Sequence, residues 1–184
     1  MINPKDYGVD YLLVNTTNQF LLEYAPLSEN SCNKLTGFTG DTGDALLCSD
    51  GGVYLFVDGR YHTQADNEVN SDVVTVVKLG LGEKQDIAIC ERIKPESVLG
   101  IVAKKVSQQR LELLQLILKE INVSIKIIKT DPFDLKISSR RKECLVLDKS
   151  LCGQTFLEKI SKIEKPALFT NSEEISYLCN IRDF

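Results

Sequence analysis

Histidine is almost absent from this sequence, since His62 is the only one among 184 residues. Imidazole nitrogens are frequent ligands of transition metals, and a lone histidine without clustered partners makes a poor ligand set. His62 opens a predicted helix with Asp66 four residues on, which favours a surface pair over a metal ligand or a general base. A histidine-rich metal centre is therefore excluded for this chain.

Long apolar runs are also lacking. No run approaches the roughly 20 residues that an α-helix needs to span a bilayer. The opening residues, MINPKD, do not have the form of a signal peptide. We expect a cytoplasmic protein that makes no contact with a membrane.

No C-x-x-C pair occurs, although the chain has six cysteines. They are scattered, at Cys32, Cys48, Cys90, Cys144, Cys152 and Cys179. An even count permits disulfides, but a chain of this size without a signal peptide is typical of a reducing compartment. Several cysteines lie in apolar runs, where a free thiol behaves as a small hydrophobic side chain.

The net charge of -4 is unevenly distributed, because residues 1–92 carry -8 and residues 93–184 carry +4. The acidic first part disfavours binding to nucleic acid. The basic run Arg140–Lys142 lacks interleaved aromatic residues and is typical of a solvated linker. We expect no nucleic-acid partner.

The most informative stretch runs from Lys34 to Val69. Two short apolar runs, Ala45–Cys48 and Val53–Val57, are joined by Ser-Asp-Gly-Gly, which predicts a β-hairpin. Val53–Val57 does not alternate polar with apolar residues, so both of its faces are expected to be covered. Three glycines ahead of the hairpin mark a sharply turning loop. A phosphate-binding loop is disfavoured, because the G-K-[ST] ending is missing and a strand follows.

The rest of the first 136 residues alternates between strands and helices, which predicts an α/β fold. Further strands are expected at Tyr11–Val14, Phe20–Tyr24, Val73–Val77, Val98–Val102 and Ser124–Ile128, and helices at Ser28–Lys34, His62–Val69, Asp86–Arg92 and Ser107–Ile121. In the last helix Ser107 is the expected cap, and Leu113, Leu114, Ile117 and Ile121 are expected on one apolar face.

A polar, basic linker is predicted at 137–143, between a domain at 1–136 and a second unit at 144–184. The second unit is expected to hold a helix at Gly153–Ile163, a strand at Ala167–Thr170 and a helix capped by Asn171 or Ser172. So small a set cannot cover its own apolar faces. We infer a truncated second α/β domain.

Several motifs resemble a known family. Leu35–Gly40 (LTGFTG), the hairpin and Val57–Ala65 (VDGRYHTQA) resemble the N-terminal domain of Xaa-Pro aminopeptidases in the creatinase/prolidase superfamily. Asp10–Val14 and Phe20–Tyr24 are similar to the opening of the three-domain cytosolic aminopeptidases P, and Glu173–Arg182 to the family's second domain. The resemblance implies a mixed, ribonuclease H-like sheet of about six strands flanked by helices.

The resemblance also implies where the chemistry lies. The family's activity resides in a C-terminal domain that holds two divalent metals, Mn by preference, with two Asp, one His and two Glu. None of those residues maps onto this sequence, so the chain is expected to have no catalytic residue, metal ligand or cofactor. The implied partners are the catalytic domain, a second copy in a homodimer, and a peptide substrate with proline in second position.

In the family the N-terminal domain lies over the active-site cleft. This makes the glycine loop and the turn after the hairpin the candidate cleft rim or interface, namely Phe38, Thr39, Gly40, Asp58, Arg60 and Tyr61. The family usually has Ser-Ala where this chain has Asp41-Thr42. Asp58 and Arg60 have a simpler alternative role, which is to fix the turn around Gly59. For the whole chain the alternative is a stand-alone binding or scaffolding module derived from that domain.

Overall fold

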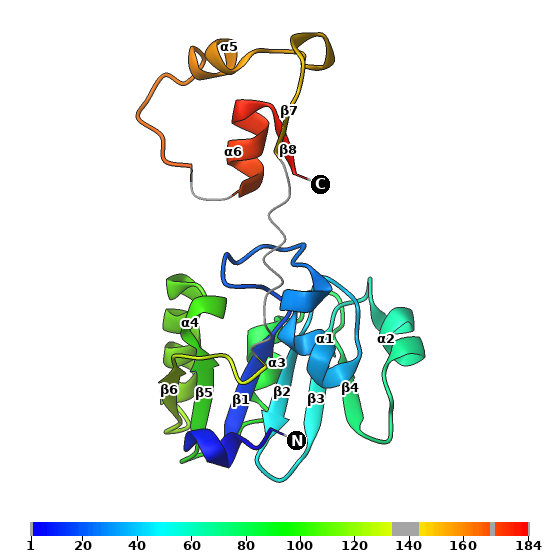
Figure 1. Ribbon diagram of the computed structural model, residues 1–184. Helices are drawn as coiled ribbons and strands as arrows, with labels where there is room; N and C mark the ends of the chain where they lie inside the picture. The colour runs from blue at the N-terminus through cyan, green and yellow to red at the C-terminus, as the bar shows by residue number, and fades with distance from the viewer. Residues whose placement is uncertain (1, 134–143, 170–171, 184) are drawn as a thin grey trace. The chain divides into compact units, whose positions relative to one another are not determined.

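The structure, a computed structural model, describes residues 2–133, 144–169 and 172–183. Its contacts divide the chain into two units, Met1–Ile137 and Ser138–Phe184, which are described separately (Figure 1). The predicted linker at 137–143 lies outside the described residues. The domain limits 1–136 and 144–184 therefore stay a prediction.

The first unit is built on one sheet of six strands in the order β4-β3-β2-β1-β5-β6. The strands are β1 (Tyr11–Asn15), β2 (Asp44–Cys48), β3 (Val53–Val57), β4 (Val74–Lys78), β5 (Val98–Val102) and β6 (Ser124–Ile128). β2 is antiparallel to β1 and β3, and every other neighbouring pair is parallel. The expected mixed six-stranded sheet and its hairpin are confirmed.

The strand order reverses beside β1. The chain builds β2, β3 and β4 outward on one side of β1, then crosses over to place β5 and β6 on the other side (Figure 1). Because only β2 runs in the opposite direction, five strands end at the same edge of the sheet, and β2 begins there. This carboxyl edge is marked by Asn15, Asp44, Val57, Lys78, Val102 and Ile128.

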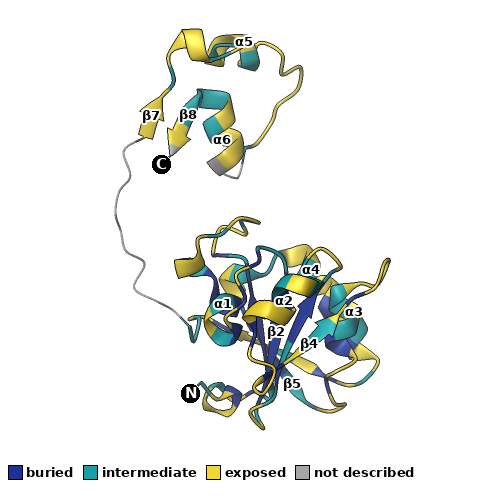
Figure 2. Ribbon diagram, turned by 90° about the vertical axis from the view of Figure 1, so that its right-hand side faces the viewer, coloured by how far each residue is buried: buried dark blue, intermediate teal, exposed yellow. Residues whose placement is uncertain are grey.

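Helices cover both faces of the sheet, as the burial of its strands in Figure 2 illustrates. They are α1 (Ser31–Thr36), α2 (His62–Glu68), α3 (Gln85–Cys90) and α4 (Gln108–Lys119), with 3-10 turns at Pro4–Tyr7, Leu27–Glu29 and Ala103–Lys105. Leu13 of β1 belongs to one core cluster with Leu114 of α4, and Leu12 belongs to the other with Ala65 of α2. Successive residues of β1 thus serve opposite layers, which explains why all five are buried.

Helix α4 begins as predicted but buries a narrower face. The Ser107 hydroxyl accepts a hydrogen bond from the Arg110 N–H at 3.2 Å, which confirms the cap. Leu114 and Leu118 are fully buried, whereas Leu113 is 44% exposed. Leu113 is therefore not part of the buried face, because the helix packs on one side of the sheet only and its outer side meets solvent.

The strand expected at Phe20–Tyr24 is wrong, since this stretch forms turns. The buried side chain of Asn18 accepts hydrogen bonds from the N–H groups of Phe20 and Leu22, at 3.0 and 3.2 Å. Leu21 takes a left-handed backbone conformation, with φ of 58°. An asparagine that bonds its own following backbone replaces the ladder bonds of a strand.

The second unit pairs two short strands, β7 (Cys144–Val146) and β8 (Ile181–Asp183), in an antiparallel sheet. It also has a 3-10 turn at Lys149–Leu151 and the helices α5 (Phe156–Ile160) and α6 (Ser172–Cys179), so the helix expected at Gly153–Ile163 is shorter than predicted. The strand expected at Ala167–Thr170 is wrong for Ala167–Phe169, and Thr170, like Asn171, lies outside the described residues.

No described residue of this second unit is buried, and Leu157 and Leu168 are 74% and 86% exposed. Apolar side chains without a core are what a unit too small to cover its own faces would show. Throughout the described residues, the helices are too short or too polar to traverse a bilayer.

A cluster of charged groups joins the sheet to the helices at the carboxyl edge. Arg110 of α4 lies 2.6 Å from a carboxylate oxygen of Asp44, the first residue of β2, and 2.6 Å from one of Asp86 in α3. Asp44 is buried and also accepts hydrogen bonds from the side chains of Asn15 and Gln85. The carboxylates keep the pKa of Arg110 raised despite its burial.

Arg110→Met should lower the free energy of unfolding by about 3 to 5 kcal/mol, because it leaves the buried Asp44 carboxylate without its cation. Chemical denaturation of the 184-residue chain measures this change. Arg92→Met is the control, since the Arg92 guanidinium is exposed and lies over the Tyr54 ring, and a loss of less than about 1 kcal/mol is expected. Equal losses in both variants would show that the buried cluster does not anchor the helices.

Candidate functional site

The structure brings the two predicted rim segments together at the carboxyl edge. The rings of Phe38 and Tyr61 meet edge to face, with centroids 5.7 Å apart. The Tyr61 hydroxyl donates a hydrogen bond to Asp41, one of the two residues that depart from the family pattern. The loop before β2 and the turn after β3 thus form one surface, although 20 residues separate Asp41 from Tyr61 in the chain.

The turn after β3 is held by Asp58. Its carboxylate accepts hydrogen bonds from the Arg60 backbone N–H at 2.9 Å and from the guanidinium at 2.8 and 3.1 Å. The Arg60 hydrogen bonds hold the pKa of Asp58 below its usual value. The Arg60 guanidinium also lies 5.3 Å from the centre of the Tyr61 ring. These contacts fix the turn, and they present an arginine side chain that is 64% exposed.

Thr39 is anchored to helix α2. Its backbone N–H and its hydroxyl donate to the two carboxylate oxygens of Glu68, at 2.8 and 2.7 Å. Gln64 donates to both the Thr39 hydroxyl and Glu68. Burial opposes ionisation of Glu68, but the hydrogen bonds from Thr39 and Gln64 outweigh it and lower the pKa.

Gly40 allows the loop to pass close to the Phe38 ring. A Cβ atom at position 40 would lie 2.1 Å from the ring's Cζ, and Phe38 is completely buried. Phe38 is therefore the apolar floor of the rim and not a contact residue on its surface. Thr39, Asp58, Arg60 and Tyr61 remain the members that reach solvent.

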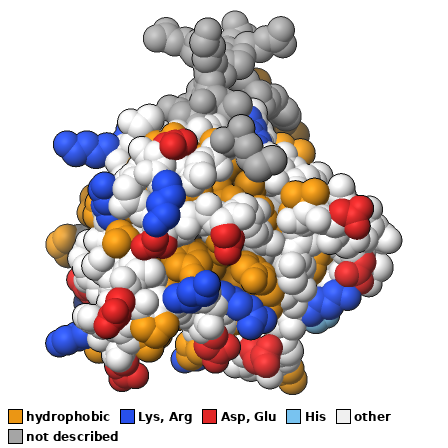
Figure 3. All heavy atoms as spheres, turned by 90° about the horizontal axis from the view of Figure 1, so that it is seen from below, with side chains coloured by type: hydrophobic (Ala, Val, Ile, Leu, Met, Phe, Trp, Pro, Cys, Tyr) orange, Lys and Arg blue, Asp and Glu red, His pale blue; other side chains and the backbone are white. Residues whose placement is uncertain are grey.

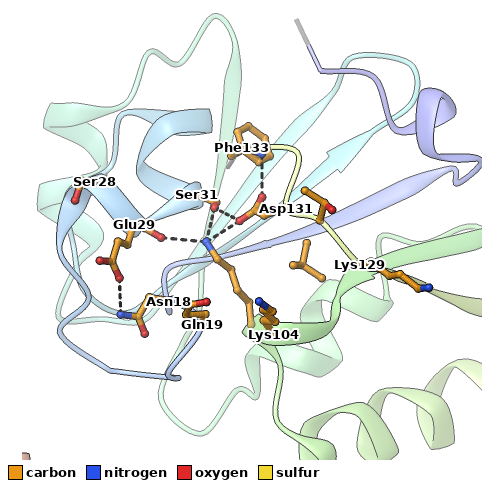
Figure 4. Close-up of a pocket in the computed structure, with 12 residues that line it drawn as sticks. Asn18, Gln19, Ser28, Glu29, Ser31, Lys104, Lys129, Asp131 and Phe133 are labelled. Atoms are coloured by element: carbon orange, nitrogen blue, oxygen red, sulfur yellow. Dashed lines mark hydrogen bonds and ion pairs between the residues drawn. The ribbon is translucent and has the colours of Figure 1, made fainter. Parts of the chain in front are cut away.

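A cavity of about 210 Å³, which the sequence did not reveal, also lies at this edge (Figure 4). Its walls come from the segment after β1, the segment after β5 and the segment after β6. Among the lining residues are Asn18, Ser31, Lys104, Lys105, Lys129 and Asp131. They are far apart in the sequence and fit no short motif, so only the sheet order could bring them together.

An ion pair at the cavity wall is nearly buried. Lys105 Nζ lies 2.7 Å from Asp131, and their side chains are 10% and 11% exposed. Lys105 also donates to the Ser31 hydroxyl and to the Glu29 carbonyl, and Ser31 donates to Asp131 at 2.6 Å. Burial alone would raise the pKa of Asp131, but the hydrogen bonds from Lys105, Ser31 and the Phe133 N–H lower it from 3.8.

His62 does not form the expected pair with Asp66. Its Nε2 lies 3.1 Å from the Leu79 carbonyl oxygen, a distance at which it donates a hydrogen bond. Asp66 pairs instead with Lys78 at 2.6 Å. The partner of the His62 ring is thus the carbonyl of Leu79, which directly follows β4.

The metal pair that the family resemblance implies would need a cluster of donor side chains. No group of three or more His, Cys, Asp and Glu side chains able to hold a metal occurs among the described residues. The described part of the chain therefore does not fit a di-metal centre.

Comparison with known proteins decides the family. Residues 5–131 match the creatinase/prolidase N-terminal domain family. The chain belongs to this family. The match contains the whole six-stranded sheet and both rim segments, and it confirms the resemblance of the LTGFTG and VDGRYHTQA motifs.

Relatives extend the likeness along the chain. A probable Xaa-Pro aminopeptidase P of Coprinopsis cinerea is 27% identical over 97% of this chain. The Xaa-Pro aminopeptidase 1 of Dictyostelium discoideum is 27% identical over 66% of it. The chain spans only 31% and 20% of the lengths of these two relatives.

Solved structures share the fold. An X-prolyl aminopeptidase from Caenorhabditis elegans, described as a cytosolic enzyme with a di-nuclear active site, superposes with a TM-score of 0.76 at 23% identity. The superposition covers 95% of this chain and 30% of that one. The N-terminal domain of the cytoplasmic peptidase PepQ from Mycobacterium tuberculosis gives a TM-score of 0.51 at 23% identity, covering 67% of this chain and 85% of that one.

Gly40→Ala should destabilise the first unit by about 1 to 3 kcal/mol, because the new methyl group collides with a buried ring that cannot move away. Thermal and chemical denaturation of the chain measure the loss. Gly59→Ala is the matched control, since nothing lies within 4 Å of a Cβ atom there. If both variants were equally stable, the close approach of the loop to Phe38 would be contradicted.

Asp131→Asn should cost about 2 kcal/mol near neutral pH, where the hydrogen-bonded carboxylate is charged. The pKa of Asp131 is lowered by folding, so its contribution is complete above the ordinary value of 3.8 and is lost as the pH falls through the lower folded pKa. The stability difference between wild type and variant should therefore be constant from about pH 5 to 7 and shrink in stronger acid. If the difference in unfolding free energy between wild type and variant grew toward low pH, the pairing of the Asp131 carboxylate with Lys105 would be refuted.

Proposed function

We propose that this chain is the non-catalytic N-terminal region of an Xaa-Pro aminopeptidase, an enzyme that removes the N-terminal residue that precedes a proline. The observation that carries the proposal is the alignment with an aminopeptidase P relative over 97% of this chain but only 31% of that protein. The remaining length of the relative leaves room for a separate catalytic domain. The second unit, which has exposed apolar side chains and no described buried residue, is the start of a domain that further chain would complete.

The metals belong to the catalytic part in this proposal. Two divalent ions, which we expect to be Mn, would be held there, and an X-prolyl aminopeptidase of the same fold is described as having a di-nuclear active site. The chain's own work is mechanical. It packs against the catalytic domain, contributes to a homodimer in the cytoplasm and narrows the entrance to the cleft, so that short peptides with free amino termini are admitted.

The rim residues could narrow the entrance to the cleft. Asp41, Asp58, Arg60 and Tyr61 form a connected polar surface at the carboxyl edge. Their mutual hydrogen bonds limit side-chain motion, so a peptide or a neighbouring domain would meet a shaped surface. Figure 3, which shows the opposite edge of the sheet, has Lys and Arg interspersed with Asp and Glu around an apolar area. That mixed face offers no field of one sign for nucleic acid.

The test uses the full-length enzyme that begins with this chain, with Arg60→Ala beside the wild type. We expect kcat/KM for an Xaa-Pro tripeptide to change by about five- to tenfold, since one rim contact is worth on the order of 1 kcal/mol. Activity on longer peptides should change relative to that on dipeptides. Arg92→Ala is the matched control, because Arg92 also lies over a tyrosine ring, Tyr54, but near the other edge of the sheet.

Three outcomes would count against the proposal. Arg60→Ala that left activity, length preference and assembly unchanged would remove the rim role. Turnover of an Xaa-Pro dipeptide by the purified 184-residue chain with Mn would show that it is itself catalytic. A stop codon directly after Phe184 in the coding sequence would favour the stand-alone binding module instead.

A further inference from the structure

The 210 Å³ cavity of the first unit lies where the strand order predicts a binding site. β1 and β5 are parallel neighbours, and the chain leaves them toward opposite sides of the sheet. The segments that follow the two strands therefore diverge, and a crevice is left between them. In open α/β sheets ligands bind in the crevice at this switch point. The cavity is lined by Asn18 and Gln19 after β1 and by Lys104 and Lys105 after β5.

The segment after β1, which forms one wall of the cavity, has an unfavourable backbone conformation that side-chain contacts hold in place. Asn18, only 2% exposed, bonds the N–H groups of Phe20 and Leu22 and donates to the Glu29 carboxylate at 2.8 Å. Leu21 has a φ of 58°, a left-handed conformation that is unfavourable for a residue with a Cβ atom. A strained backbone kept in place by a buried side chain is characteristic of a preorganised site.

Three lysines and two carboxylates line the cavity, so the lining carries a net positive charge, and both carboxylates are hydrogen-bonded to other wall residues. Glu29 accepts from Asn18, and Asp131 is paired with Lys105 and Ser31 (Figure 4). Lys104 and Lys129 are exposed and have no ion pair or hydrogen bond within the described part of the chain. Their flexible four-carbon stems allow the ammonium groups to reach a bound anion. The charge left over for a ligand is therefore positive.

Neutral polar groups complete the lining. Gln19, Ser28 and Thr130 reach the cavity, and their side chains make no hydrogen bond among the described residues. Val102 and Phe133 add an apolar surface. At about 210 Å³ the cavity is smaller than the roughly 300 to 1,000 Å³ pockets that hold drug-sized ligands, which favours a small molecule.

We propose that this cavity binds a small carboxylate, held by Lys104 and Lys129 with its apolar part against Phe133. Two sources share that chemistry. One is a free small carboxylic acid, and the other is the C-terminal carboxylate of a short peptide that reaches the same edge. The site itself does not depend on the proposed aminopeptidase role, because its binding is measured on this chain alone.

The experiment is a titration of the isotope-labelled 184-residue chain, followed by the shifts of its backbone amide signals in NMR spectra. The probes are N-acetylglycine, the matched neutral N-acetylglycinamide, the peptide Ala-Pro-Gly and inorganic phosphate. N-acetylglycine should shift the amides of residues 18–19, 104–105 and 129–131 with a Kd on the order of 1 mM. N-acetylglycinamide should leave them unchanged.

The double variant Lys104→Gln/Lys129→Gln should weaken this binding at least about tenfold. The matched control is Lys84→Gln/Lys119→Gln, which removes the same charge from exposed positions outside the cavity and should bind as the wild type does. Shifts produced only by Ala-Pro-Gly, and lost in the first double variant, would support the site with the peptide as its source. Equal shifts from acid and amide, binding of phosphate alone, or binding that survives the first double variant would overturn the proposal.

Discussion

The ion cluster around Arg110 is the constraint on which the functional edge of the first unit depends. One guanidinium forms ion pairs with both Asp44, at the start of the antiparallel strand β2, and Asp86, in the first turn of α3. A buried carboxylate is tolerated only when it is paired and hydrogen-bonded. Arg110 therefore holds the start of β2 in place. The rim residues of the glycine loop, which directly precedes β2, are positioned by the same contact.

The rim and the cavity share one edge because of topology. Because β1, β3, β4, β5 and β6 run in one direction, their carboxyl ends lie at the same edge of the sheet, together with the start of β2. Polar contacts hold three of the segments at this edge: Asp58 with Arg60, Thr39 with Glu68 and Asn18 with Glu29. The sheet supplies rigidity and the segments after the strands supply chemistry, the usual division of labour in α/β folds.

The two units differ in what they can do alone. The first has a covered sheet with a core on each face. The second pairs strands of three residues each, and none of its described residues is buried. A unit without a core gains little from folding by itself, which agrees with a chain that spans about a third or less of the relatives it matches.

The family, the α/β pattern, the hairpin and the Ser107 cap could all be predicted from the sequence, because each depends on residues close together in the chain. Two predictions from the local sequence pattern were wrong. Hydrogen bonds that the Asn18 side chain accepts from the following backbone replace the strand expected at Phe20–Tyr24. Leu113 lies on the solvent side of α4 and not on its buried face. The pairing of Arg110 with Asp44, the pairing of Lys105 with Asp131 and the cavity lined by the second pair became visible in the folded chain alone. Those pairs depend on strand order, which brings distant residues together and leaves no local signal to read.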